Sequence, residues 1–168
     1  MTLGIAAKYN DGVVCVTDTA ITYSDNRFHT PTIKGGHRWD GFIMYAGEPW
    51  LCHEVVWDAG LQTTNDVIKA LANKYKGDDD GHPVFPAEFL KATYNSIYIL
   101  GQGEVFGDYD YACIGSGSTT AWPLLDALYK RVRNKTEYNT KKMLGEVMRL
   151  TEKYDTTVYR PFLFEVLA

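Results

Sequence analysis

Short apolar runs separated by turn residues dominate the first part of the chain. The runs 4–8 and 13–17 are joined by a Tyr-Asn-Asp-Gly segment whose Asp11-Gly12 pair is a strong hairpin signal. After a polar stretch over 24–32, a second pair of short strands is predicted over 31–34 and 42–46, across an Asp-Gly turn. The chain therefore begins as an antiparallel sheet.

The spacing of the apolar residues then changes to that of helices. Pro49 suits a first helical turn, and a helix is predicted from there to Gly60. A second helix is predicted from Thr64 or Asn65 to about residue 75, and the two should cover one side of the sheet. Strands are predicted again over 93–100 and 111–114.

Two further amphipathic helices and a final strand close the chain. The helices are predicted over about 119–133 and from about Thr140 to Tyr154, and the strand over 157–167. Each pair of helices needs a sheet face against which it can bury its apolar side. We therefore expect an α+β fold, a four-layer α-β-β-α sandwich, formed as a single domain over residues 1–168.

Composition and charge exclude several classes of protein. The hydrophobic content of 45% and charged content of 23% are ordinary for a globular protein. The net charge of −4 gives no electrostatic reason to bind nucleic acid, and no apolar run approaches the length that crosses a bilayer. Because no basic stretch precedes an apolar one at the N-terminus, we expect a cytoplasmic protein without membrane or nucleic-acid partners.

The residues that often hold metals lack the spacing of a metal site. Cys15, Cys52 and Cys113 are odd in number and far apart, which favours small core residues over a disulfide framework or zinc cluster. The acidic run 78–80 is interpreted as a solvated loop, and His53 lacks the partner histidine of an H-E-x-x-H metalloprotease. A Ser-His-Asp triad stays open, although none of the four histidines lies in a nucleophile-elbow context.

Short segments in a fixed order carry the strongest functional signal. Thr2 is followed by a hairpin that ends in Val-Thr-Asp at 16–18 and then by Thr-Ala-Ile-Thr. Lys34 precedes a predicted strand, Tyr-Ala-Gly at 45–47 leads into a predicted helix, and Cys-Ile-Gly-Ser-Gly-Ser at 113–118 opens another. In order and spacing, over nearly the whole chain, these segments resemble the proteasome β-subunit family and its HslV-type relatives, of the bacterial or phage-like kind.

The resemblance implies an N-terminal-nucleophile (Ntn) hydrolase whose nucleophile is Thr2, exposed once Met1 is removed. A threonine hydroxyl is a weak nucleophile until a base takes its proton. The free α-amino group can be that base, directly or through a water, because its reference pKa of roughly 7.7–8.0 leaves part of it neutral near physiological pH. A threonine at position 2 would carry little weight by itself.

Three further residues match positions of the family's active site. Asp18 and Lys34 match its buried acid and lysine, which implies that Lys34 disfavours a charged terminal ammonium and that Asp18 orients Lys34. A salt bridge at a strand end is the alternative for this pair. Ser116 matches a serine that hydrogen-bonds around the terminal amine; an anion-binding loop is the alternative, although a P-loop lysine and a full G-x-G-x-x-G are missing.

The resemblance also implies residues that contact the substrate. Gly47 matches the residue whose backbone N–H stabilises the tetrahedral oxyanion, and Thr22 matches a position whose backbone pairs with an extended substrate. Ile21, Tyr45 and Pro49 would then shape a moderately apolar pocket, with core packing as the alternative for all three.

The match is weaker toward the C-terminus. Asp155 is present, but Val158 occupies the position three residues later where the family often has a serine. Thr156 or Thr157 could supply the hydroxyl or a carbonyl instead, around a bound monovalent cation. Leu3 stands where many relatives have a second threonine.

These matches predict a threonine endopeptidase that cuts unfolded polypeptides without a metal or organic cofactor. The family implies self-association in stacked rings and a separate AAA+ ATPase unfoldase that supplies substrate. Two alternatives stay open: a catalytically silent ring or scaffold subunit that keeps Met1, and an Ntn amidohydrolase that acts on a small amide.

Overall fold

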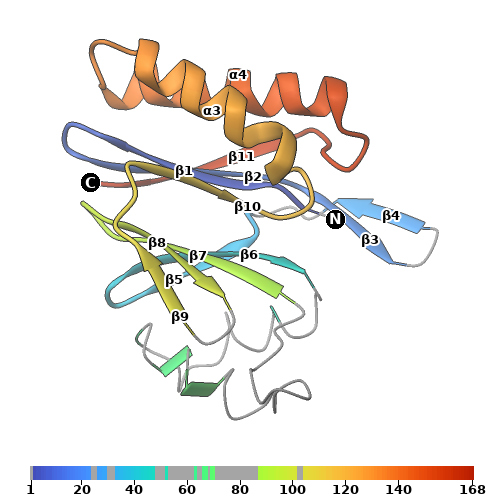
Figure 1. Ribbon diagram of the computed structural model, residues 1–168. Coiled ribbons are helices and arrows are strands. Elements are labelled where there is room, and N and C mark those ends of the chain that lie inside the picture. The colour runs from blue at the N-terminus through green and yellow to red at the C-terminus, as the bar shows by residue number, and fades with distance from the viewer. Residues whose placement is uncertain are drawn as a thin grey trace.

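The computed structural model describes residues 2–23, 26–29, 33–47, 52, 63, 66–67, 69–70, 87–101 and 104–168. In Figure 1, helices lie on one face of a sheet, and a second sheet lies on the other face of that sheet. The strands are β1 (Gly4–Tyr9), β2 (Gly12–Asp18), β3 (Ala20–Tyr23), β4 (Asn26–His29), β5 (Gly35–Arg38), β6 (Gly41–Gly47), β7 (Ala87–Ala92), β8 (Ile97–Gly101), β9 (Glu104–Gly107), β10 (Tyr111–Ile114) and β11 (Phe162–Leu167). The helices that the structure describes along their whole length are α3 (Ser118–Arg131) and α4 (Glu137–Tyr154).

The four-stranded sheet forms the centre of the molecule, with strand order β10-β1-β2-β11 and antiparallel neighbours throughout. Successive side chains of a strand point to opposite faces, and both faces of this sheet are buried. Ile5 and Val16 pack toward α3 and α4, whereas Ala6 and Cys15 pack toward the second sheet. This is why β2 is buried at every position instead of alternating between apolar and polar residues.

The second sheet has five antiparallel strands in the order β5-β6-β7-β8-β9. Phe42, Met44 and Leu90 face the first sheet. On the opposite face, Ile43 and Phe89 cluster with a few residues of the segment 52–70, whose described helical positions are 52, 66–67 and 69–70. These positions lie beyond the second sheet (Figure 1), where the sequence predicts the other helical layer.

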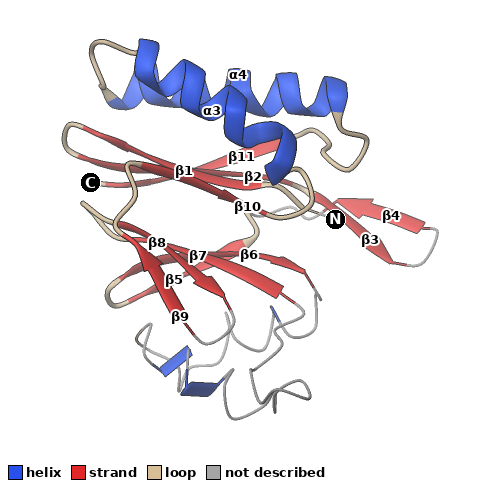
Figure 2. Ribbon diagram, viewed as in Figure 1, coloured by secondary structure: helices blue, strands red, loops and turns tan. Residues whose placement is uncertain are grey.

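A separate two-stranded hairpin, β3-β4, extends beyond the sheets near the N-terminal end of the chain, as Figure 2 shows. The sequence did not predict it, because the stretch 24–32 is polar and lacks the alternation of a half-buried strand. The two helices predicted over 49–60 and 64–75 fall largely outside the described residues.

Several predicted elements are confirmed. The first hairpin, β10 and α3 lie within two residues of their predicted positions. Helix α4 begins earlier than expected, because Thr136 caps it by accepting a hydrogen bond from the Asn139 N–H at 3.3 Å. Cys15, Cys52 and Cys113 lie outside disulfides and are buried, as expected of core residues. No helix within the described ranges is both long and apolar enough to cross a membrane.

Of the strand predicted over 31–34, residues 31–32 lie outside the described residues and 33–34 are not in a strand. The structure places β5 just after them, at Gly35–Arg38, paired with the start of β6. Strand β5 begins with Gly-Gly, and because glycine is depleted in strands this segment does not predict a strand. The structure requires a glycine there, since a Cβ on Gly35 would lie 2.6 Å from both the Ile43 carbonyl oxygen and the Phe42 ring.

The strand predicted over 93–100 was wrong in its first half. Residues 93–96 form the turn between β7 and β8, in which the Thr93 N–H donates to the Ser96 carbonyl at 2.9 Å. Strand β7 itself was missed because Ala-Glu-Phe-Leu-Lys-Ala consists largely of good helix formers. The final strand begins at Phe162, because residues 155–158 form a turn that belongs to the site described next.

Candidate active site

The Thr2 side chain lies among buried polar groups at the start of β1. Thr2 is 6% exposed, and the Lys34 Nζ donates a hydrogen bond to the Thr2 Oγ1 at 2.9 Å. Lys34 is held from both sheets: its N–H donates to the Thr17 Oγ1 of β2 at 3.1 Å, and its carbonyl accepts from the Tyr45 N–H of β6 at 3.2 Å. The threonine and the lysine predicted to act together are therefore in direct contact.

Asp18 completes this cluster from the end of β2. Its Oδ1 accepts from the Lys34 Nζ at 3.1 Å and from the Leu3 N–H at 3.0 Å, and Asp18 and Lys34 are 0% and 1% exposed. The Lys34 Nζ also donates to the Ala20 carbonyl. An ammonium carries three hydrogens, and here they have three acceptors: a carboxylate, a carbonyl and the Thr2 hydroxyl.

Burial disfavours the charged forms of both Asp18 and Lys34. It lowers the pKa of Lys34 from its ordinary value, opposed by the nearby Asp18 carboxylate. It likewise raises the pKa of Asp18, opposed by the Lys34 charge and by the Leu3 N–H. Lys34 is thus a lysine that can lose its proton more easily than one in water.

A second set of hydrogen bonds runs from the backbone nitrogen of Thr2 to a carboxylate. The Thr2 N–H donates to the Ser116 Oγ at 3.4 Å, and the Ser116 hydroxyl donates to the Thr157 Oγ1 at 3.1 Å. The Thr157 hydroxyl in turn donates to the Asp155 Oδ1 at 2.6 Å, and the Thr157 N–H reaches the same oxygen at 2.8 Å. Thr157 therefore supplies the hydroxyl that the sequence left open between Thr156 and Thr157.

Two glycines with positive φ border the site. Gly115, between β10 and Ser116, has φ +96°, and a Cβ there would lie 2.1 Å from the Thr2 carbonyl oxygen. Gly47 ends β6 with φ +136°. Only glycine adopts such angles readily, so both turns depend on it.

Comparisons with known proteins identify the fold that carries this cluster. No family model matches the sequence, and no curated protein matches it. Among solved structures, eukaryotic HslV from Trypanosoma brucei is 20% identical with a TM-score of 0.68, over 99% of each chain. BPH from Thiobacillus denitrificans, a bacterial proteasome homologue, is 15% identical over 99% of this chain: its complex with epoxomicin gives a TM-score of 0.74 over 98% of that chain, and a second structure gives 0.71 over 97%. This chain has the proteasome-type fold.

The proteasome-type fold is the α-β-β-α sandwich of Ntn hydrolases, so the predicted fold class is confirmed. Within it, the structure brings together five of the predicted catalytic residues, namely Thr2, Asp18, Lys34, Ser116 and Asp155. Gly47 lies at the end of β6, paired with Ala87 of β7. The catalytic roles of these residues stay predictions.

The predicted substrate contacts are less completely described in this proteasome-type fold. Ile21 and Thr22 lie on β3, and their side chains, like the whole of Pro49, fall outside the described residues. Tyr45 is half-buried and packs against the cluster on the outer face of the second sheet, as its core-packing alternative implies. The monovalent cation expected near Thr156 or Thr157 stays a prediction.

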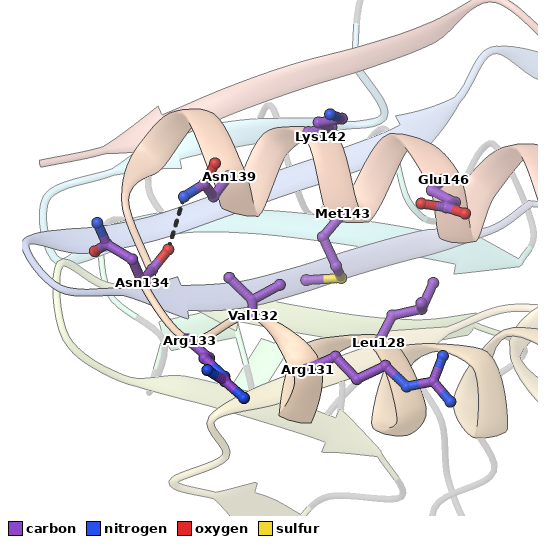
Figure 3. A pocket seen from close by; sticks show the side chains of 9 residues that line it. All are labelled: Leu128, Arg131, Val132, Arg133, Asn134, Asn139, Lys142, Met143 and Glu146. Atoms are coloured by element: carbon purple, nitrogen blue, oxygen red, sulfur yellow. Dashed lines mark hydrogen bonds between the residues drawn. The ribbon is translucent and has the colours of Figure 1, made fainter.

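A pocket of about 290 Å³ lies between α3 and α4, away from the Thr2 cluster. Figure 3 shows its lining of Leu128, Arg131, Val132, Arg133, Asn134, Asn139, Lys142, Met143 and Glu146. Ser116 precedes the start of α3, whereas the pocket lies at its end, and a helix of 14 residues is about 20 Å long. None of the predicted site residues lines this pocket. Within the described ranges no group of three or more His, Cys, Asp or Glu side chains could hold a metal ion.

Sequence reasoning missed two contributors to this part of the proteasome-type fold. The Ala20 carbonyl is invisible to residue-type arguments because every residue has one. Glu88 accepts a hydrogen bond from the Gly115 N–H at 2.6 Å, yet it lies in a segment for which no strand was predicted. Placing β7 correctly would have set Glu88 opposite Ala46, next to Gly47.

Proposed function

We propose that this chain is a threonine endopeptidase whose nucleophile is the Thr2 hydroxyl, activated after Met1 is removed. The observation that carries the proposal is the 2.9 Å contact between the Lys34 Nζ and the Thr2 Oγ1 inside a buried cluster with Asp18. The proteasome-type fold, shared with HslV and with an epoxomicin-bound proteasome homologue, supports the same reaction class.

In the proposed reaction the neutral α-amino group of Thr2 takes the hydroxyl proton, directly or through a water. The Oγ1 then attacks the substrate carbonyl carbon, and the Gly47 N–H stabilises the oxyanion that forms. As the C–N bond breaks, the α-ammonium passes this proton to the leaving amine, which departs. The α-amino group of Thr2 then takes a proton from a water molecule, and the resulting hydroxide attacks the ester. The proton passes to the Thr2 Oγ1 as the acyl group leaves, which restores the hydroxyl.

The buried cluster supports the two states through which the nucleophile passes. A charged Lys34 beside Thr2 disfavours a second ammonium nearby, which keeps the α-amino group neutral and able to accept a proton. The same charge stabilises negative charge on the Oγ1 as its proton leaves. Asp18 compensates the lysine charge, which would otherwise be buried without a counter-ion.

The Ser116, Thr157 and Asp155 chain orients the amine. Each hydroxyl in the chain donates toward Asp155, so the Ser116 oxygen is left to accept from the Thr2 nitrogen. This direction of hydrogen bonding would hold one amine hydrogen on Ser116 and leave the nitrogen lone pair for the hydroxyl proton. The amine is thereby placed as a base rather than left free to rotate.

The likeness to HslV and to a proteasome homologue also supports self-assembly into stacked rings. We include in the proposal an unfolded polypeptide as substrate, a separate AAA+ ATPase that delivers it, and the cytoplasm as the place of action. Each of these is proposed by analogy with proteins of the proteasome-type fold, and no contact within the described part of the chain carries it.

Intact mass and active-site labelling test the proposal. Protein expressed with an active methionine aminopeptidase should lack Met1, and epoxomicin should add to Thr2 as seen by peptide mass spectrometry. Thr2→Ala should abolish the adduct, whereas Thr119→Ala, at an exposed threonine of α3, should leave it unchanged. Retention of Met1 by the native protein would exclude Thr2 as nucleophile and favour a silent ring subunit.

A further inference from the structure

Glu88 joins the two sheets beside the Thr2 cluster. It lies on β7 of the five-stranded sheet, and its Oε2 accepts from the N–H of Gly115, which follows β10 of the four-stranded sheet. At 2.6 Å from the backbone nitrogen to the carboxylate oxygen, this is a short hydrogen bond. The Glu88 side chain is exposed, so its carboxylate is not required to fill the core.

Gly115, the residue that Glu88 holds, touches both halves of the proposed site. A Cβ on Gly115 would lie 2.1 Å from the Thr2 carbonyl oxygen and 3.0 Å from the Ala46 Cβ. Its backbone is therefore packed between the chain at Thr2 and the end of β6. Ala46 is also the residue opposite Glu88 across the β6-β7 ladder and directly precedes Gly47.

The next residue, Ser116, carries the hydroxyl that meets the Thr2 nitrogen. A shift of the Gly115 turn would move that hydroxyl away from the amine and would change its distance from Gly47. Without Glu88, water can satisfy the Gly115 N–H, because this hydrogen bond lies at the solvent-exposed side of the turn. The fold should therefore persist while the turn loses its fixed position. A displacement of about 1 Å at a reacting group can cost about 100-fold in rate.

We infer that Glu88 is a positioning residue, which fixes the Ser116 side of the site against the Gly47 end of β6. This inference rests on the proposed peptidase function for its kinetic consequence, but its structural part stands on the Glu88–Gly115 contact alone. The positioning role depends on the length of the Glu88 side chain and on an acceptor oxygen at its end, not on the charge of the carboxylate.

Three variants separate these properties. Glu88→Gln keeps the side-chain length and an acceptor oxygen but loses the charge. Glu88→Asp keeps the charge but is one methylene too short, and Glu88→Ala loses the length, the acceptor and the charge. We expect Glu88→Asp and Glu88→Ala to slow epoxomicin labelling by about 10- to 100-fold and Glu88→Gln by less than about 3-fold. Peptide hydrolysis should show the loss in kcat, with KM nearly unchanged. Glu146→Ala, which removes an exposed carboxylate of α4, should label at the wild-type rate.

Hydrogen exchange measured by mass spectrometry tests the contact independently of activity. The peptide containing 113–118 should exchange faster in Glu88→Asp and Glu88→Ala than in wild type, but not in Glu88→Gln or Glu146→Ala. The inference is overturned if Glu88→Asp retains labelling while Glu88→Gln loses it, which would indicate a charge effect. Unchanged exchange in Glu88→Ala would overturn it as well. If the wild type itself is not labelled, the peptidase proposal fails and the exchange result alone decides the role of Glu88.

Discussion

Burial and charge act in opposite directions on Lys34. Loss of solvent lowers its pKa, whereas the Asp18 carboxylate at 3.1 Å raises it. The three acceptors around its Nζ favour the ammonium, and the Thr2 Oγ1 is one of them. Burial is the larger of the two effects, so Lys34 loses its proton at a lower pH than an exposed lysine.

Removing the Lys34 amine should affect stability and chemistry separately. Lys34→Ala leaves Asp18 buried without its counter-ion, and we expect a loss of about 3–5 kcal/mol of stability together with loss of epoxomicin labelling. The double variant Lys34→Met with Asp18→Asn should regain much of the melting temperature but none of the labelling. Labelling at full rate in Lys34→Ala would contradict its proposed role.

The pH dependence of labelling should be bell-shaped. The rate rises with pH as the α-amino group of Thr2 loses its proton and becomes a base. It falls again when Lys34 loses its proton and the stabilising charge disappears. Because burial lowers the pKa of Lys34, the falling limb should lie below pH 10.5, the ordinary value for a lysine. A rate that kept rising to pH 10.5 would show that the Lys34 charge is not needed.

Thr157 should be replaceable by serine but not by valine. Thr157→Val keeps the shape but removes the hydroxyl between Ser116 and Asp155, so the orientation of the Thr2 amine should be lost. We expect labelling to slow by about 10-fold or more in Thr157→Val and by less than about 3-fold in Thr157→Ser. Equal rates in the two variants would exclude a role for the hydroxyl.

Which residues of the site could be predicted from the sequence depends on the kind of contact that each one makes. Thr2, Asp18, Lys34 and Ser116 were recognisable because their spacing resembles a known pattern, and the structure brings them together. The sequence could not decide between Thr156 and Thr157, because the answer depends on which hydroxyl the turn after α4 directs at Asp155. Such a direction is set by backbone angles that adjacent threonines do not reveal.

At the scale of elements, the turn from β10 into α3 leaves little room for substitution. Gly115→Ala would place a methyl group against the Thr2 carbonyl at a positive φ, which costs about 1–3 kcal/mol for the backbone angle alone. We expect a lower melting temperature and little labelling.

Gly145→Ala is the matched control, because among the described residues outside the helix's own backbone the added methyl would meet only the Phe164 Cζ, at an ordinary contact distance of 3.7 Å. Alanine in the middle of α4 should raise stability by about 0.5–1 kcal/mol and leave labelling unchanged. A similar effect of both substitutions on labelling would contradict the importance of the Gly115 turn.

The elements that the sequence predicted well are those whose stability comes from local signals. The Asp-Gly hairpin and the amphipathic helices α3 and α4 were located within a few residues. Strands β5 and β7 were misplaced or missed, because their residues favour other local structures and only pairing with β6 makes them strands. Non-local pairing overrode the local preference in both cases.

At the scale of the whole molecule, the fold persists at 15–20% identity because layer packing tolerates many substitutions. The four-layer order was predictable, since two helix pairs around two groups of strands leave few other ways to bury every apolar face. The exact pairing of β1 with β10 and of β2 with β11 was not, because these partners lie far apart in the sequence.

The assembly state separates the proposed peptidase from a small-amide hydrolase. A chain of 19.0 kDa that forms stacked rings should sediment at many times its own mass and show rings by electron microscopy. The same preparation should be used for epoxomicin labelling, so that assembly and activity are compared directly. A monomer or dimer that labels fully would favour the small-amide hydrolase.

The two-residue step from Asp155 to Thr157 affects how chains of this kind are sorted in genome surveys. The position at which the family pattern expects a serine is Val158, which is fully buried in the core cluster formed with α3 and α4. The hydroxyl reaches the carboxylate from one residue earlier. A search pattern that demands the serine would discard this sequence as a degenerate copy, whereas one that also accepts Asp-x-Thr would retain it among the chains worth assaying.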